Sequence, residues 1–253
     1  MFYDKESDFE DDLVAVLKRH GWTDGVLEYP TEQDLISNWA NILFDNNKGI
    51  DRLNGQRLTK GEMAQILEQI ETLRTPLALN SFINGKTVSI KRDNPKDEAH
   101  YGKEISLKIY DRQEIAAGQS RYQIARQPIY PAKNKMLNDR RGDICLLING
   151  MPVIHIELKK SGIPISQATN QIAKYAHEGV FTGLFRLVQV FVAMNPDDAV
   201  YFANPGEGDF NDDYFFHWAD YNNEPIAANK HVGQDEWKRF ASDLLSIPMA
   251  HQL

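Results

Sequence analysis

The sequence predicts an α/β domain: a mixed central β-sheet flanked by helices, with additional N-terminal helices and a hairpin. Three observations predict this fold class. Apolar residues recur at helical spacing through the first third of the chain, and their period changes to two from Ser81 onward. A helical stretch then separates two strand-like runs beyond residue 160. This order of elements is typical of α/β domains with both parallel and antiparallel strands.

The first third of the chain is predicted to be mainly helical. Residues 7–20 open with an acidic turn, carry apolar residues at helical spacing and stop at Gly21. Residues 32–44 and 60–73 repeat the apolar spacing, and the second of these stretches ends before a Thr-Pro pair. We expect a helix in each of the three stretches.

Two Asn-Gly pairs indicate β-hairpins in the middle of the chain. The first pair lies within residues 82–88, and further strands are expected at 106–110 and 122–124. The second pair, Asn149-Gly150, joins an apolar run at 144–148 to an alternating run at 153–159. The second hairpin is the more informative one, because its arms carry the acidic residues discussed below.

The region after the second hairpin is predicted to alternate between helix and strand. Ser166 is a plausible N-cap for a helix that stops at Gly179. Residues 187–193 and 199–203 are apolar enough to form buried strands. This alternation is typical of an α/β domain with a mixed sheet.

The chain is interpreted as a single domain, residues 1–253, in three parts. A helical part covers about 1–80, a core about 81–205, and a loop followed by a helix about 206–253. Residues 204–229 are rich in Asn, Asp, Gly and Pro but also carry aromatic residues, so an ordered loop is expected there. A last helix is expected near 235–245.

The composition excludes several classes of protein. With 42% hydrophobic and 25% charged residues, the 253-residue chain has the balance of a globular domain. Its start lacks the basic and apolar segments of a signal peptide, and no apolar run is long enough to span a membrane. We therefore expect a cytoplasmic protein. The single cysteine, Cys145, rules out a disulfide framework and a thiolate zinc site, and it is expected to be buried.

The net charge of −8 is unevenly distributed along the chain. Residues 1–80 carry a net −7, residues 81–175 a net +7 and residues 176–253 a net −8. A basic middle between acidic ends suits a domain that binds DNA on one face. The alternative, a chance distribution of solvated charges, stays open at this stage.

Asp143 and the tripeptide Glu157-Leu158-Lys159 are the residues most suited to chemistry. Hydrolysis of a phosphodiester needs charge neutralisation, an activated water and a stabilised leaving oxygen, all of which a carboxylate-bound divalent metal can supply. Mg²⁺ takes one or two carboxylates and keeps several waters. Asp143, Glu157 and the carbonyl of Leu158 would make a reasonable set of ligands, with Lys159 directed at the phosphate or the water.

The hairpin that carries these residues presents a geometric problem. Glu157 and Lys159 share one face of their strand, as does His155, whose role is left open. A strict two-residue turn at Asn149-Gly150 would place Asp143 opposite Ile156 and therefore on the other face. We predict an odd-length loop or a bulge, with Gly150 in a left-handed conformation, or Asp143 just before the regular strand.

Polar and basic residues surround the predicted site in the sequence. Gln167, Gln171 and Tyr175 share one face of a helix with Lys174 at its edge, where they could fix a phosphate or a catalytic side chain or simply be solvated. Six basic residues before Asp143 are candidates for contacts to the DNA backbone. They are Arg121, Arg126, Lys133, Lys135, Arg140 and Arg141.

At these residues the sequence resembles a known family. The run from Arg141-Gly142-Asp143 to Lys160, with Gln171-x-x-x-Tyr175 behind it, is similar to the N-terminal nuclease domain of the restriction (R, HsdR-type) subunit of type I restriction-modification enzymes. The tracts from Asn84 to Asp93 and from Leu187 to Val192 also resemble that family, so the likeness covers most of residues 5–205.

The resemblance implies a restriction-endonuclease-like PD-(D/E)xK fold and a magnesium-dependent endonuclease that cleaves double-stranded DNA. It implies Asp143, Glu157 and Lys159 as the catalytic set, with Gln171 and Tyr175 as an auxiliary motif. In related nucleases an acidic residue on the first helix often completes the metal site. Glu10 is the best candidate for that role here.

The sequence departs from full restriction subunits in its length and in lacking a motor. Those subunits carry an ATP-driven translocase after the nuclease, whereas this chain has no Gly-x-x-x-x-Gly-Lys-Ser/Thr loop to hold nucleotide phosphates. We interpret it as an N-terminal fragment that does not itself bind ATP. The resemblance also implies modification and specificity subunits as partners.

Two alternatives to a restriction nuclease remain at this stage. A repair or recombination nuclease of the same fold would share the three catalytic residues and differ in its substrate. A non-catalytic docking module for translocase or methyltransferase subunits would keep the fold, but it would have no chemical reason to keep Asp143, Glu157 and Lys159 together.

Overall fold

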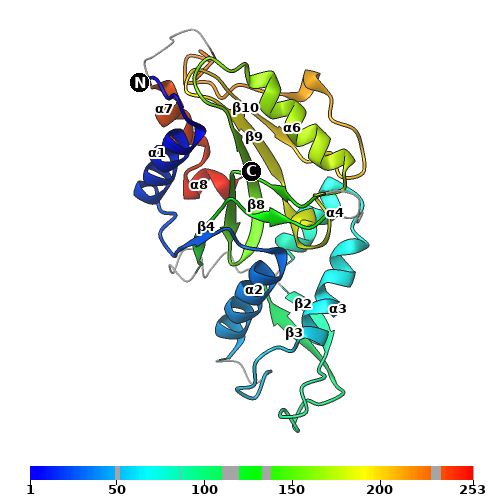
Figure 1. Cartoon of the computed structure of the whole chain (residues 1–253). Helices are drawn as coiled ribbons and strands as arrows, with labels where there is room; N and C mark the ends of the chain where they lie inside the picture. Colours follow the sequence, from blue (N-terminus) through cyan, green and yellow to red (C-terminus); the bar gives the residue numbers. More distant parts are fainter. Residues whose placement is uncertain (49–51, 86, 110–119, 133–137, 229–234, 253) are drawn as a thin grey trace.

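A mixed six-stranded sheet forms the centre of the molecule (Figure 1). The computed structural model describes residues 1–48, 52–85, 87–109, 120–132, 138–228 and 235–252. The sheet order is β1-β4-β7-β8-β9-β10, with β1–β4 and β8–β9 parallel and the other pairs antiparallel. The strands are β1 (Val26–Glu28), β4 (Tyr122–Arg126), β7 (Ile144–Ile148), β8 (Met151–Leu158), β9 (Val190–Met194) and β10 (Ala199–Ala203). The predicted α/β class with a mixed sheet is confirmed.

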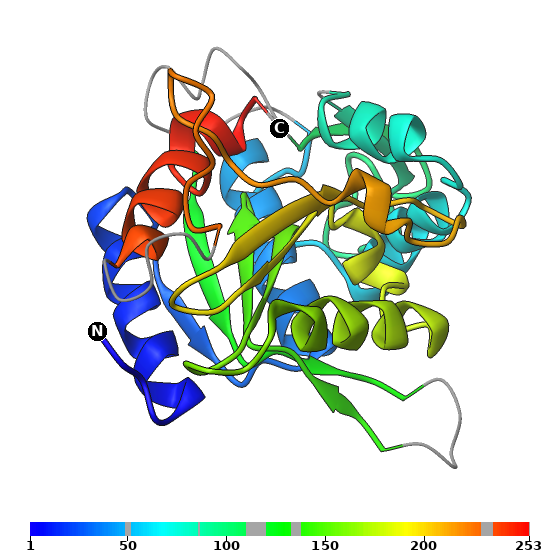
Figure 2. The same ribbon diagram turned by 90° about the horizontal axis from the view of Figure 1, so that it is seen from above.

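Helices cover both faces of this sheet (Figures 1 and 2). On one side, α1 (Glu6–Arg19) packs against α7 (Glu236–Leu244), and the short α8 (Ile247–Ala250) follows. On the other side, α6 (Ile165–His177) packs on β8 and β9. Phe9 and Trp237 meet edge to face at 5.0 Å, so the first and last long helices share one core.

The predicted N-terminal helices are confirmed, and each of the next two begins with a capping box. In α2 (Glu32–Asn47) the cap is Thr31, and in α3 (Lys60–Glu71) it is Thr59. Strand β1 was not expected, because three residues are too few to show an alternating pattern. Through β1, the helical part predicted for residues 1–80 contributes the edge strand of the central sheet.

The hairpin expected at residues 82–88 is wrong. Helix α4 (Pro76–Ile83) includes the first two residues of that stretch. It forms because Thr75 caps it by accepting a hydrogen bond from the amide of Ala78 and Pro76 is favourable in the first turn. Strand β2 (Thr87–Lys91) follows and pairs instead with the later strand β3 (Glu104–Lys108). The Asn-Gly pair therefore ends a helix here. Tyr110, expected at the end of β3, lies outside the described residues.

The β7–β8 hairpin contains the predicted bulge. Asn149 and Gly150 form a two-residue turn with φ values of +51° and +84°, and Ile148 pairs with Met151. One residue further along, the register shifts, so that Ile144 pairs with Ile156. The extra residue on the β8 arm is Val153. It reverses the parity of the following pairs and places Asp143 opposite Glu157, directly before the regular strand.

The region after the hairpin agrees with the predicted order and differs in its boundaries. Pro164, not Ser166, is the N-cap of α6, because its fixed φ of −59° starts the helix two residues earlier. The helix stops as expected, with Gly179 at a φ of +73°. Residues Gly183–Leu187 form the 3-10 helix η1, so β9 begins three residues later than expected.

The last part of the chain is ordered where the structure describes it. A 3-10 turn, η2 (Asp212–Tyr214), lies in the predicted loop, and Phe216 bridges to Tyr201 beside β10. The expected C-terminal helix is present as α7. No described helix is both long enough and apolar enough to span a membrane.

Candidate active site

Asp143 lies directly before strand β7 and contacts the end of strand β8, the other arm of the bulged hairpin. A short ribbon of β5 (Ile129–Tyr130) and β6 (Arg140–Arg141) leads the chain into this residue. The Asp143 carboxylate accepts a hydrogen bond of 2.7 Å from the backbone amide of Leu158. Its own carbonyl accepts one of 2.7 Å from the amide of Gln127. The side chain is therefore fixed against the tripeptide that carries the other catalytic candidates.

Glu157 is fully buried near the end of β8, beside Asp143 and Lys159. Neither carboxylate oxygen has a hydrogen-bond partner among the described residues. The nearest cationic atom is Nζ of Lys159, 3.7 Å from Oε1, and Nε2 of His155 lies 3.3 Å from Oε2. Burying a carboxylate with a single cation at 3.7 Å is costly, so this position is unfavourable for the chain alone.

Burial changes the acidity of both carboxyl groups. It raises the pKa of Glu157 to about 8, against the opposing effect of the Lys159 charge. Burial, followed by the charge of Glu157, raises the pKa of Asp143 well above its ordinary value. Two enclosed carboxyl groups that resist ionisation, one of them with unpartnered oxygens, are a donor set that a divalent cation would satisfy. The residues present fit a magnesium ion.

Lys159 lies beside both the acidic residue and the carbonyl predicted to bind metal. Its Nζ donates a 2.8 Å hydrogen bond to the Leu158 carbonyl and is 3.8 Å from Oε1 of Glu6, at the start of α1. Its backbone amide bonds to the carbonyl of Met194 on β9, which holds the end of the strand. Lys159 is thus placed within the predicted site, in contact with one of its predicted metal ligands.

Glu10 is near the site, but its carboxylate is already occupied. One oxygen accepts a hydrogen bond from Arg126 and the other a 3.0 Å bond from the side chain of Gln127. Its charge contributes to the raised pKa of Asp143. Among the described residues, no group of three His, Cys, Asp or Glu side chains is close enough to hold a metal. The assignment of Glu10 as a third metal ligand stays a prediction.

The auxiliary residues of α6 act on the backbone next to Asp143. Gln171 donates a 2.7 Å hydrogen bond to the hydroxyl of Tyr175, and this hydroxyl donates a 2.9 Å bond to the carbonyl of Arg141. Burial raises the pKa of Tyr175 to about 12, so the phenol keeps its proton. Gln171 and Tyr175 therefore fix the loop that carries Asp143, whereas Gln167 and Lys174 on the same helix are exposed.

The basic residues expected to contact DNA differ in their surroundings. Arg121 pairs with Asp45 at 2.8 Å, Arg140 pairs with Glu178 at 2.6 Å, and Arg126 pairs with Glu10. Arg141 is exposed, forms no ion pair within the described ranges, and has its guanidinium 5.6 Å from the centre of the Tyr29 ring. Lys133 and Lys135 lie outside the described residues.

Two residues to which the sequence assigned no role, Tyr130 and Gly142, pack against the site. Tyr130 is buried, and its hydroxyl lies 2.8 Å from Nδ1 of His155. A Cβ atom on Gly142 would be 2.7 Å from the Tyr130 hydroxyl and 2.8 Å from Cε1 of His155, so no side chain fits there. The position of Gly142 directly before Asp143 was a usable signal, whereas nothing in the sequence connects Tyr130 with residues 25 positions away.

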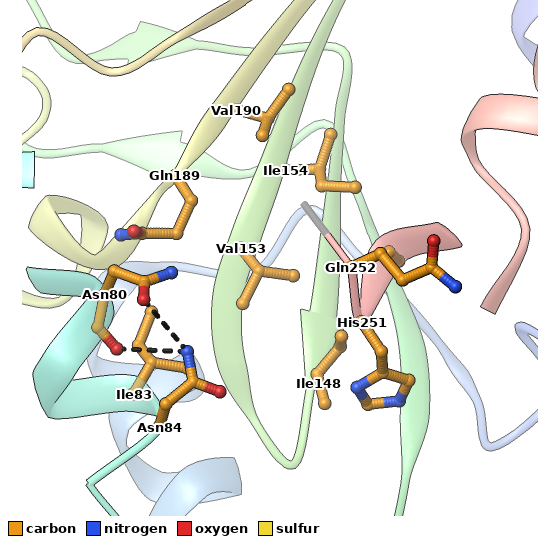
Figure 3. A pocket seen from close by; sticks show the side chains of 11 residues that line it. Asn80, Ile83, Asn84, Ile148, Val153, Ile154, Gln189, Val190, His251 and Gln252 are labelled. Atoms are coloured by element: carbon orange, nitrogen blue, oxygen red, sulfur yellow. Dashed lines mark hydrogen bonds between the residues drawn. The ribbon is translucent and has the colours of Figure 1, made fainter. Parts of the chain in front are cut away.

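A hollow of about 210 Å³ lies elsewhere on the sheet (Figure 3). Its walls come from α4 and from the residues after α8, and Val153 and Ile154 extend into it from the bulge. Asp143, Glu157 and Lys159 do not line it. The acidic site is therefore separate from this hollow.

The fold and the site together define the class of this domain. A mixed sheet flanked by helices, with a bulged hairpin that presents an Asp and a Glu-x-Lys tripeptide on one face, is a restriction-endonuclease-like fold. The chain matches the family described as type I restriction enzyme R protein N terminus over residues 6–210, and it belongs to that family.

Relatives of known name support the same assignment. The chain is 31% identical over 230 residues to the type I restriction enzyme SsaAORF53P endonuclease subunit of Staphylococcus saprophyticus, covering 89% of this chain and 22% of that protein. It is 30% identical over 221 residues to the EcoprrI endonuclease subunit of Escherichia coli, covering 81% and 66%. The chain therefore spans about a fifth of the length of the staphylococcal relative.

Proposed function

We propose that this chain is the magnesium-dependent endonuclease domain that cleaves double-stranded DNA within a type I restriction enzyme. The observation that carries the proposal is the buried Glu157 carboxylate, whose oxygens lack hydrogen-bond partners among the described residues, beside Asp143 and Lys159. A fold gains nothing from enclosing these groups together unless a cation and a substrate complete the arrangement. The relatives named as endonuclease subunits support this reading.

Asp143, Glu157 and the Leu158 carbonyl would hold the metal ion, with Glu10 as a further candidate on α1. When bound, Mg²⁺ neutralises charge on a phosphate and makes a coordinated water more acidic. The hydrogen bond from the Leu158 amide keeps the Asp143 carboxylate in place for this task. The raised pKa of Glu157 means that metal binding must displace a proton from this carboxyl group near neutral pH.

The other residues of the site position groups and balance charge. The ammonium of Lys159 would stabilise the negative charge that develops on the scissile phosphate, because it is held 2.8 Å from the Leu158 carbonyl next to the acidic pair. Tyr175, held by Gln171, donates a hydrogen bond to the Arg141 carbonyl and so fixes the backbone beside Asp143. Arg141 is the best placed of the described arginines to contact the DNA backbone.

The remaining activities belong to other parts of the assembly. The chain has no nucleotide-binding loop of the Walker type, so we infer that ATP is used by translocase domains outside these residues. Modification and specificity subunits would supply methylation and target recognition. An enzyme acting on chromosomal or invading DNA would work in the cytoplasm, as the sequence predicts.

Cleavage of circular DNA by the assembled enzyme tests this proposal. We expect Asp143→Ala and Lys159→Ala to abolish cutting in the presence of Mg²⁺ while ATP consumption continues. Lys238→Ala is the matched control, since Glu236-Trp237-Lys238 repeats the same Glu-x-Lys pattern on α7, where Lys238 pairs with Asp235. Normal cutting by either site variant would refute the assignment of the site.

A further inference from the structure

His155 is a buried polar residue in the same strand as Glu157, two positions before it. The imidazole is fully buried and surrounded by rings: the centroid of Phe181 is 5.3 Å away and that of Phe191 is 5.9 Å away. Both ring nitrogens nevertheless face polar atoms. Nδ1 is 2.8 Å from the hydroxyl of Tyr130, and Nε2 is 3.3 Å from Oε2 of Glu157.

The surroundings of His155 determine where its proton lies. The imidazole is enclosed by aromatic rings, and a neutral imidazole carries a single N–H, on either Nδ1 or Nε2. Burial raises the pKa of Tyr130, so its hydroxyl keeps a proton to donate. If this hydroxyl donates to Nδ1, the imidazole proton is on Nε2 and faces Glu157. An ionised carboxylate only accepts hydrogen bonds, so this is the tautomer that suits Glu157 in its metal-binding state.

The same pair of residues also contacts the loop that carries the other acidic residue. Gly142 lies so close that a Cβ atom there would collide with Tyr130 and His155. Tyr130 itself lies on β5, in the ribbon that leads into Asp143. A rigid Tyr–His unit is thus packed against Glu157 on one side and against the Asp143 loop on the other.

We propose that His155 is a positioning residue that orients the Glu157 carboxylate through its Nε2–H group, while Tyr130 fixes the imidazole tautomer. This inference rests on the proposed function, because it gives Glu157 the role of metal ligand. Nε2 and both oxygens of Glu157 are buried without hydrogen-bond partners among the described residues. Nε2 and Oε2 are already 3.3 Å apart, so a reorientation that directs the N–H at the carboxylate would satisfy one atom of each. Residues that hold a metal ligand in this way strongly affect metal affinity.

The test measures Mg²⁺ binding by this chain with titration calorimetry, without DNA. We expect His155→Leu to weaken Mg²⁺ affinity about 10- to 100-fold. We expect His155→Gln, whose amide can replace the Nε2–H donor, to recover most of the loss. Tyr130→Phe should weaken affinity by a smaller factor. Tyr122→Phe is the matched control, because it removes another Tyr–His hydrogen bond, the 2.9 Å contact to His251, and should leave Mg²⁺ affinity unchanged.

A second measurement separates positioning from a merely structural role. Nitrogen NMR of the Mg²⁺-saturated chain should show His155 protonated on Nε2, and Tyr130→Phe should introduce the other tautomer. Wild-type affinity in a folded His155→Leu variant, equal losses in the Leu and Gln variants, or an Nδ1–H tautomer in the wild type would each overturn the proposal. Should His155→Leu fail to fold, the Mg²⁺ affinity of the Tyr130→Phe variant and the tautomer of His155 in that variant decide whether the proposal holds.

The outcome is distinguishable from failure of the proposed nuclease function. If Mg²⁺ binds to the wild-type chain and depends on His155 as expected, but the assembled enzyme does not cut DNA, the function fails and the positioning role stands. If cutting depends on Asp143 and Lys159 but the His155 variants bind Mg²⁺ as tightly as the wild type, only the positioning role fails.

Discussion

Replacing Glu157 with Gln should make the metal-free protein more stable at pH 8. The wild-type carboxyl is fully buried, and its pKa is raised from an ordinary 4.5 to about 8. Below pH 4.5 the group is protonated in both the folded and the unfolded states, so its ionisation adds no cost to folding. Between pH 4.5 and 8 the unfolded chain loses this proton while the folded chain retains it, so rising pH favours unfolding.

The size of this effect follows from the same shift. A tenfold change in a protonation equilibrium corresponds to about 1.4 kcal/mol, so the wild type loses on the order of 3 to 5 kcal/mol between pH 4.5 and pH 8. Glu157→Gln removes that loss, and it also removes the charge that helps to raise the pKa of Asp143. Urea unfolding with a chelator present, at pH 5 and pH 8, measures the difference. We expect the variant to gain about 3 kcal/mol at pH 8 and little at pH 5.

Glu62→Gln is the matched control for this substitution. Glu62 is as deeply buried as Glu157, but its carboxylate is paired with Arg92 at 2.6 Å and accepts backbone hydrogen bonds from Thr59 and Asp93. Removing that charge should destabilise the protein by about 3 kcal/mol. The reasoning is refuted if Glu157→Gln is neutral or destabilising at pH 8, or if its gain does not shrink toward pH 5.

Three further substitutions test the surroundings of the site. Arg141→Ala should weaken DNA binding and lower the slope of log affinity against log salt concentration by about one phosphate contact. Arg140→Ala should have less effect, because the charge of Arg140 is paired with Glu178. Tyr175→Phe should lower the cleavage rate about tenfold without large loss of stability, because it releases the Arg141 carbonyl; an unchanged rate would remove Tyr175 from the positioning role. Gly142→Ala should cost about 2 kcal/mol in thermal unfolding, and a neutral result would contradict the close packing against Tyr130.

The bulge could be predicted because it follows from counting residues. A two-residue turn fixes which residues pair, and the acidic residues could share a face only if the count changed by one. The hairpin expected at residues 82–88 failed for a complementary reason. The Asn-Gly pair was weighed without the helix cap at Thr75 and the favourable Pro76, which together start a helix just upstream.

The contacts that complete the candidate site could not be predicted from local patterns. Tyr130 reaches His155 only through the arrangement of the ribbon and β8, across 25 residues of sequence. The ion pair between Glu10 and Arg126 likewise joins residues 116 positions apart. Periodicity reports which face of an element is buried, but it does not say which distant side chains meet there.

The single extra residue at Val153 constrains how the length of this hairpin can change. Deleting Val153 itself would remove the bulge and leave Glu157 opposite Asp143, whereas inserting one residue between Val153 and Glu157 with the bulge retained would turn the Glu157 carboxylate toward the opposite side of the sheet. Deleting or inserting two residues there would keep the carboxylate on its side of the sheet but move it two positions along the strand, out of register with Asp143. The pairing of Glu157 with Asp143 is therefore expected to tolerate loss of the bulge residue, but not a one-residue change that leaves the bulge in place.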